Sequence, residues 1–314
     1  MGIGAHACEG RARCWMCPHS ASSARCRRRS VCCLLRAGAR VDGEDALGWA
    51  PLCAAARAGN ARVCEVLLRQ GASVDRPGRA AYGAAALELA CQSGHVEVAR
   101  LLLEHDAAID RVDDDGYTAL TAACHAGQHA AAALLLVHGA APNGPPSATA
   151  HTTPLGAASL KGHVHVAELL LDSGADVDKQ DLEGFLPLNC AAQDGHSAVA
   201  KLLLARGADV DQRCAGGYTA LCMACQKGHQ DVADLFLAQG ADVNVVTAEG
   251  DTPLHVSCQE GHAELAAHLI KRGAHVDARG PNRQTPLMMA AYTGRGSVAA
   301  LLLAKGEFGA LGVR

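Results

Sequence analysis

The feature that most constrains this chain is a sequence unit that returns at a fixed interval. The run Gly217 to Asn244, GYTALCMACQKGHQDVADLFLAQGADVN, recurs on both sides with the same landmarks in the same order. Its first leucine, Leu221, has counterparts at Leu188 and Leu254, each 33 residues away. A fixed period of this length indicates a tandem array in which each unit buries its apolar face against its neighbours.

Within this unit, the punctuating residues predict two short helices joined by a tight turn. Thr219 supplies a hydroxyl at the start of the first helix, where it can accept a hydrogen bond from a free backbone N–H. Gly228 ends that helix and Gly240 ends the second, because glycine adopts the left-handed conformation found at helix ends. Residues 241–244 then lead into an extended finger. Helices of about two turns are unstable alone in water, so we expect the units to stabilise one another by stacking.

The landmarks that the units share identify the pattern. They are Gly-x-Thr-Pro-Leu, an alanine, Gly-His, a valine, Leu-Leu and Gly-Ala-x-Val-Asp/Asn, and residues 250–277 carry them nearly whole. This pattern resembles the ankyrin repeat, and the resemblance covers most of the chain. It implies an all-α solenoid of helix-turn-helix units with short β-hairpin-like fingers, and a protein that binds other proteins.

The repeat register divides the chain into two parts. Residues 31–314 are expected to form the ankyrin-repeat array, with about eight full repeats after a half-repeat at residues 31–42. Residues 1–30 are rich in arginine and cysteine and are expected to form a degenerate repeat or a poorly defined leader. The last unit lacks the polar outer face of a capping repeat, which favours a chain that continues into something longer. The first leucines of the full units are Leu52, Leu87, Leu120, Leu155, Leu188, Leu221, Leu254 and Leu287.

Composition and charge narrow the expected setting. The formal net charge is −4, but residues 1–40 are strongly basic and leave the array acidic, which argues against nucleic acid as its main ligand. No apolar run approaches the length of about 18 residues that a membrane span needs. The 15 cysteines, many at small-residue positions inside helices, indicate a reducing environment. We therefore expect an intracellular, cytoplasmic monomer, with the nucleus as an alternative location.

Two groups of cysteines have spacings that metal or redox chemistry uses. Cys222 and Cys225 form a Cys-x-x-Cys pair, but they fall inside a first helix, which indicates packing. The N-terminal segment supplies thiols and an imidazole in sufficient number for a tetrahedral zinc site. A zinc module, a mitochondrial transit peptide and a disordered leader therefore stay open as alternatives for residues 1–30. The candidate zinc ligands are Cys8, Cys14, Cys17, His19 and Cys26.

Histidine follows glycine in unit after unit. A catalytic histidine belongs to one site, whereas these share one register at the turn between the helices. The resemblance implies that they orient this turn by hydrogen bonding and that His255 also has a structural role. The sequence contains no HExxH, phosphate-loop or GxSxG motif, so we expect no catalytic residue, cofactor or metal in the array. The recurrent histidines are His95, His163, His196, His229 and His262.

Aromatic residues are rare in this chain and collect in or near the fingers. Large aromatic side chains anchor many protein interfaces, although packing against the neighbouring finger explains the same positions. Polar residues near the ends of the first helices add a track beside them. The candidate partner-binding residues are Trp49, Tyr82, Tyr117, Phe185, Tyr218 and Tyr292, with Gln193, Asp194, Gln226, Lys227, Gln259 and Glu260.

These expectations favour a non-catalytic scaffold or adaptor that binds a protein partner through a concave groove and the finger tips. Acidic residues nearby, including Glu183 and residues 113–115, predict a mildly acidic groove. We therefore expect a basic or mixed-charge, partly extended partner segment. The alternative is that the chain is the substrate-recruiting region of a larger enzyme or RNA-binding protein.

Overall fold

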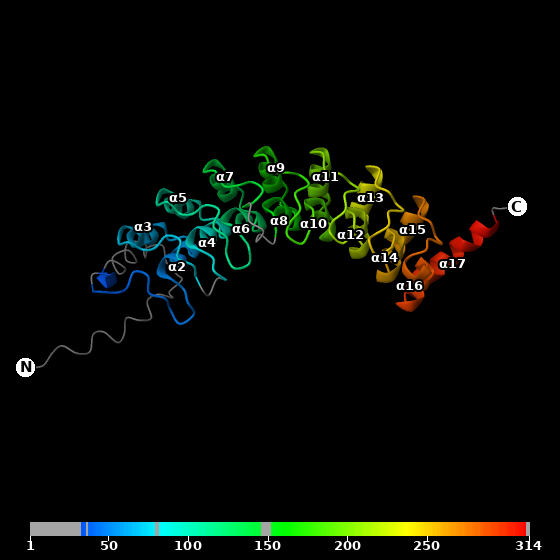
Figure 1. The fold of residues 1–314 in the computed structure, drawn as a ribbon, viewed down its shortest axis with the longest axis horizontal. Helices are drawn as coiled ribbons and strands as arrows, with labels where there is room; N and C mark the ends of the chain where they lie inside the picture. The colour runs from blue at the N-terminus through cyan, green and yellow to red at the C-terminus, as the bar shows by residue number, and fades with distance from the viewer. Residues whose placement is uncertain (1–32, 36, 79–81, 146–151, 312–314) are drawn as a thin grey trace, which may run out of the picture.

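The structure is a computed structural model that describes residues 33–35, 37–78, 82–145 and 152–311. Within these ranges the chain forms eight helix pairs stacked in one curved array (Figure 1), which confirms the predicted all-α solenoid. None of the helices described is both long enough and apolar enough to cross a membrane. The predicted zinc ligands and the rest of residues 1–30 lie outside the described residues.

Each pair consists of a short first helix, a tight turn and a second helix. The first helices are α2 (Pro51–Arg57), α4 (Ala86–Gln92), α6 (Ala119–His125), α8 (Pro154–Leu160), α10 (Pro187–Gln193), α12 (Ala220–Lys227), α14 (Pro253–Glu260) and α16 (Pro286–Tyr292). The second helices are α3 (Ala61–Arg69), α5 (Val96–Glu104), α7 (His129–Val137), α9 (Val164–Asp172), α11 (Ser197–Ala205), α13 (Gln230–Ala238), α15 (Ala263–Lys271) and α17 (Gly296–Leu311). A 3-10 helix, η3 (Pro281–Arg283), lies in the last finger.

The helix ends form for the reasons that the sequence indicated. The side chain of Thr219 accepts a hydrogen bond from the backbone N–H of Cys222 at the start of α12, and Gly228 ends that helix with a φ of 78°. Helix α10 has no side-chain cap at Leu186 but begins with Pro187, which has no N–H to satisfy there. Hydroxyl capping and proline occur separately in α12 and α10, and together in α8, α14 and α16.

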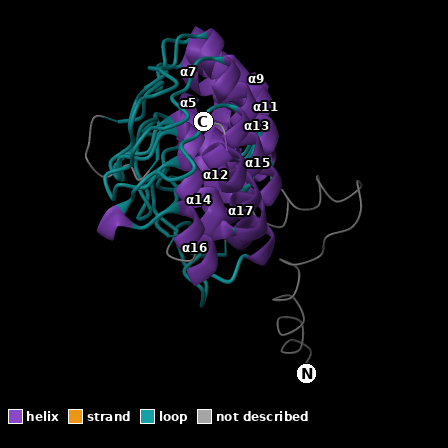
Figure 2. Ribbon diagram, turned by 90° about the vertical axis from the view of Figure 1, so that its right-hand side faces the viewer, coloured by secondary structure: helices purple, strands orange, loops and turns teal. Residues whose placement is uncertain are grey.

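The two rows of helices pack unequally, and this inequality curves the molecule. The first helices are rich in alanine and other small residues and pack more extensively on one another than the second helices do. The array therefore bends toward the first helices, which line the inner side of the curve (Figure 1). Figure 2 shows the fingers projecting together from one side of the helices.

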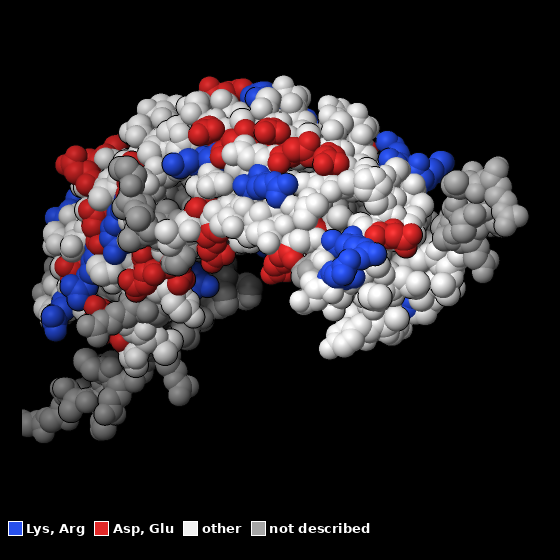
Figure 3. Space-filling view, turned by 45° about the vertical axis from the view of Figure 1, so that its right-hand side comes forward, with Lys and Arg blue, Asp and Glu red and all other residues white. Residues whose placement is uncertain are grey.

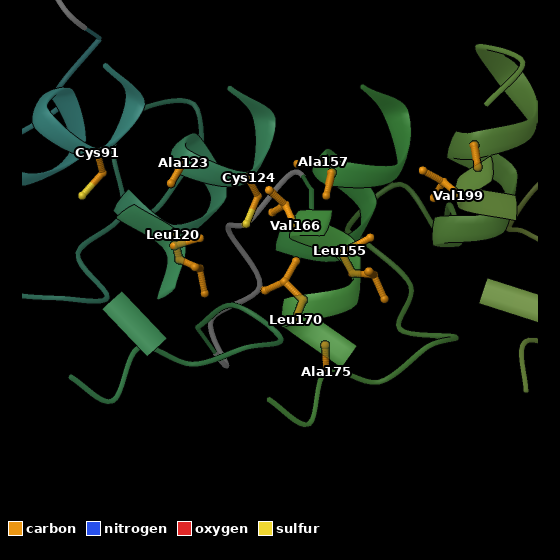
Figure 4. Packing of buried hydrophobic residues seen from close by; sticks show 14 of the residues in the cluster. Cys91, Leu120, Ala123, Cys124, Leu155, Ala157, Val166, Leu170, Ala175 and Val199 are labelled. Atoms are coloured by element: carbon orange, nitrogen blue, oxygen red, sulfur yellow. The ribbon is translucent and has the colours of Figure 1, made fainter. Parts of the chain in front are cut away.

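The core runs through the array as rows of equivalent residues. Cys91, Cys124, Cys225 and Cys258 occupy one position of the first helix and are each 0% exposed. Figure 4 shows Cys91 and Cys124 pointing into the layer between units. The prediction that these cysteines serve packing is confirmed. The second helices contribute a matching row in which every side chain is 0% exposed, formed by Leu102, Leu135, Leu170, Leu203, Phe236 and Leu269.

The fingers are joined by a ladder of hydrogen bonds from unit to unit. In the described residues they contain no strand, and turn hydrogen bonds hold them. At seven successive fingers, the Asp or Asn at the base accepts a hydrogen bond from a backbone N–H one unit further along. The distances run from 2.8 to 3.4 Å for the pairs Asp42 with Ser73, Asp75 with Ala108, Asp110 with Ala141, Asn143 with Asp176, Asp178 with Asp209, Asp211 with Asp242 and Asn244 with His275.

Candidate functional site

Two positions of the repeat meet in the first and third units, on the inner side of the curve. The finger position lies three residues before the first leucine of the unit. The helix-end position lies five residues after that leucine, at the end of the first helix. In the first unit, the Arg57 guanidinium carbon lies 5.1 Å from the centroid of the Trp49 ring. In the third unit, the ring centroids of Tyr117 and His125 lie 6.2 Å apart at an interplanar angle of 86°. The finger aromatic therefore lies over the helix end of its own unit.

We call this surface the concave face. It consists of the finger position, the helix-end position and the residue directly after the helix-end position in each unit. Of the sequence-predicted candidates, Trp49, Tyr117, Phe185 and Tyr218 occupy the finger position, and Tyr292 shares the helix-end position with three glutamines. Tyr82 lies elsewhere in its finger, five residues before Leu87.

The finger aromatics take part in packing as well as facing outward. Trp49, Phe185 and Tyr218 are partly buried against the hydrophobic core. The Tyr218 hydroxyl lies 3.4 Å from Oε2 of Glu249 in the next finger. Burial raises the pKa of Tyr218, and Glu249 adds to this effect. These contacts match the alternative of packing against the neighbouring finger, while part of each ring stays accessible.

Two aromatic candidates are far more exposed. Tyr82 is 70% exposed and Tyr292 is 91% exposed. Tyr82 has a φ of 50°, in the left-handed region that is unfavourable for a side chain of this size, and its carbonyl accepts a hydrogen bond from Asp114. Tyr292 ends α16 in the last unit of the array.

The polar candidates leave their side chains free, although their backbone has a structural task. The carbonyls of Gln193 and Gln226 accept hydrogen bonds from His229 and His262, and that of Gln259 accepts one from Arg295. In the described part of the chain, the side-chain amides of these three glutamines make no hydrogen bond. The backbone therefore joins the units, and the amides are available to a ligand.

The recurrent histidines join units rather than orient their own turn. The Nε2 atoms of His95, His163, His196, His229 and His262 lie 3.0–3.2 Å from carbonyl oxygens of the preceding first helix. Because a carbonyl oxygen only accepts, each Nε2–H donates. A structural role is confirmed, but each hydrogen-bond partner lies in the preceding unit. The glycine at the turn of that preceding unit leaves room for the imidazole ring. A Cβ on Gly59 would lie 2.6 Å from ring atoms of His95.

Glu88 is a residue that the sequence analysis missed. It directly follows the first leucine of its unit and is 8% exposed, with Asp113 acting on it from the next finger. Burial is the main reason that its pKa rises to about 9, and the charge of Asp113 adds to the rise. The sequence feature that could have pointed to Glu88 is a carboxyl at a position that other units fill with small or neutral side chains.

Among the described residues, no group of three or more His, Cys, Asp or Glu side chains is arranged to hold a metal ion. Burial raises the thiol pKa of both Cys222 and Cys225, which keeps these thiols protonated and unreactive. The Cys-x-x-Cys pair thus belongs to the core.

The geometry defines the class of protein. It is a stacked array of helix pairs whose inner surface varies from unit to unit, whereas its buried rows stay constant. A family model described as ankyrin repeats (3 copies) matches residues 19–113, 108–181, 173–247 and 237–310. The chain therefore belongs to the ankyrin-repeat family, whose repeats are generally protein-interaction modules. A comparison with curated proteins gave no match.

Proposed function

We propose that the protein is a non-catalytic scaffold that binds a protein partner on its concave face. The observation that carries the proposal is the division of labour within each unit. The buried rows, the turn histidines and the finger ladder hold the units together, whereas the amides of Gln193, Gln226 and Gln259 have no hydrogen-bond partner within the described ranges. A preformed face of this kind binds without ordering loops, which keeps the entropic cost of association low.

The chemistry of the face points to a protein segment as the ligand. Half-buried aromatic rings offer flat apolar anchors, and amide side chains can both donate to and accept from a peptide backbone. On the side of the molecule that Figure 3 shows, acidic and basic side chains are interspersed instead of forming one field of a single sign. A mixed-charge partner segment is therefore favoured over a uniformly charged polymer.

The proposal is tested by affinity purification from the native cell with a variant that carries Tyr117→Ala, Phe185→Ala and Tyr218→Ala. We expect this variant to lose most of the partner that the unchanged protein captures, because truncating anchor residues costs more than about 1 kcal/mol each. Thermal unfolding monitored by circular dichroism checks that the variant remains folded.

A matched control places the change on the other side of the array. Val137 ends the second helix α7 and is 84% exposed. Val137→Ala should retain the captured partner. Equal capture by the triple variant and the unchanged protein would remove the concave face as the binding surface.

A further inference from the structure

The concave face carries charges of alternating sign in four successive units. The residue six positions after the first leucine is Lys161 in the fourth unit, Asp194 in the fifth, Lys227 in the sixth and Glu260 in the seventh. Lys161, Asp194 and Lys227 are exposed, and Glu260 is half-buried. In the described part of the chain, none of the four takes part in an ion pair. These charges are therefore not used to hold the units together.

The spacing of the units sets the spacing of these charges. The four residues end or directly follow helices α8, α10, α12 and α14, which pack side by side in that order. Axes of packed helices lie about 10 Å apart. A peptide in the polyproline II conformation advances about 3.1 Å per residue with three residues per turn, so every third side chain lies on the same side of the peptide. Neighbouring charges therefore face ligand residues three positions apart.

Unbonded amides flank this row of charges. Gln193, Gln226 and Gln259 each precede one of the acidic or basic residues, and their side chains make no hydrogen bond to the part of the chain that the structure describes. An amide binds a peptide backbone whatever its sequence, whereas a charge discriminates between side chains of opposite sign. The two rows together provide both general affinity and sequence preference.

We propose that units four to seven bind a peptide segment of about ten residues in the polyproline II conformation, whose charged side chains recur every third position and alternate in sign. Acidic side chains face Lys161 and Lys227, and basic side chains face Asp194 and Glu260. The proposal rests on the proposed function and specifies the chemistry of the partner. Two of the four charges are basic and two are acidic, so this row does not match the expectation of a mildly acidic groove.

The test uses the full chain and four synthetic ten-residue peptides with a serine and glutamine background, each measured by fluorescence anisotropy. The alternating peptide carries Glu at positions 1 and 7 and Lys at positions 4 and 10. The block peptide carries Glu at 1 and 4 and Lys at 7 and 10, and the out-of-register peptide carries alternating charges at every second position. We expect the alternating peptide to bind about ten-fold more tightly than the block peptide or the out-of-register peptide. In those two peptides, two or more of the exposed charge pairs with the protein become repulsive or are lost. The preference should shrink in 0.5 M salt.

A charge-reversal variant of the protein provides the most discriminating comparison. The fourth peptide carries Glu at 1, 4 and 7 and Lys at 10, and it matches the variant Asp194→Lys. The unchanged protein should prefer the alternating peptide, and the variant should prefer the fourth peptide, each by about five-fold. Lys201→Glu on the outer helix α11 is the control, and it should preserve the preference of the unchanged protein.

The proposal is overturned by any of three results. The alternating peptide fails to bind, all peptides bind equally, or Asp194→Lys does not reverse the preference. Failure of the proposed function is recognised separately, because it is measured by capture of a natural partner with the triple aromatic variant. Capture that depends on the aromatic residues, combined with peptides that bind equally, would leave the scaffold standing and remove the alternating pattern.

Discussion

At the scale of single residues, the position directly after the first leucine shows how one buried site tolerates different chemistry. In the seventh unit it is His255, whose Nε2 donates to the carbonyl of Gln284 while Nδ1 accepts from Thr252. In the fifth unit it is Asn189, neither of whose side-chain amide atoms finds a partner among the residues that the structure describes. In the second unit it is Glu88, whose pKa rises to about 9 because it is buried. The polar side chain at this position has its hydrogen bonds in the seventh unit, whereas its burial costs free energy of folding in the second and fifth units.

Glu88→Gln is expected to stabilise the protein increasingly as the pH rises. In the unfolded chain the carboxyl ionises near pH 4.5, whereas in the folded protein it keeps its proton until about pH 9. The free energy of unfolding of the unchanged protein therefore falls between these values, and a glutamine removes that loss. We expect a gain of about 1–3 kcal/mol at pH 8 and little change at pH 5, measured by urea unfolding.

The exposed Glu97 on helix α5 provides the control for this prediction. Glu97→Gln should shift the stability little at either pH. A gain from Glu88→Gln that is the same at pH 5 and pH 8 would contradict the argument from burial.

At the scale of elements, the glycine at the end of the first helix has two roles that the glycine after the second helix does not share. Gly228 has a φ of 78° and Gly240 a φ of 90°, so both favour glycine for their backbone conformation. A Cβ on Gly228 would also lie 2.6 Å from the ring of His262, whereas none of the described residues would have an atom within 4 Å of a Cβ on Gly240. The first glycine therefore also makes room for the link between units.

Gly228→Ala and Gly240→Ala separate these two roles. Gly240→Ala should cost about 1 kcal/mol of stability, since only the left-handed conformation is strained. Gly228→Ala should exceed that cost by at least about 1 kcal/mol, because it also displaces His262 and its hydrogen bond to Gln226. Equal losses in chemical denaturation would show that the histidine link contributes nothing.

At the scale of the whole molecule, stability passes from neighbour to neighbour along the array. Each helix pair contacts the pair before it and the pair after it, and the finger ladder and the histidine links follow the same path. Cooperativity in such an array depends on intact interfaces between units. Interfaces in the middle of the chain therefore matter more than those at its end for the cooperative unfolding of the whole array.

Leu170→Ala and Leu302→Ala test this dependence. Leu170 is 0% exposed in the fourth unit, and Leu302 is 2% exposed in the last. A cavity at Leu170 should cost about 2–5 kcal/mol and split the urea unfolding curve into two transitions, because the units on either side lose their coupling. Leu302→Ala should cost less and leave the main transition single. A single sharp transition for Leu170→Ala would mean that the array unfolds as one block whatever its centre contributes.

The sequence alone predicted the class of fold, because a period of 33 residues marked by Thr219, Gly228 and Gly240 indicates a stacked array and the shared landmarks resemble the ankyrin repeat. It also determined that the cysteines pack, since equivalent positions along a stack share one environment. Only the tertiary structure decided that each turn histidine reaches the preceding unit, because its acceptor lies 36 to 38 residues earlier in the chain.

The chemistry of the buried and facing residues was likewise decided in three dimensions. The raised pKa of Glu88 depends on burial and on Asp113 from another unit, and no local pattern encodes either. Trp49 and Arg57 meet because the finger folds back over its own helix. Local periodicity therefore specifies each unit, while contacts between units and between fingers and helices specify the surface that a partner would meet.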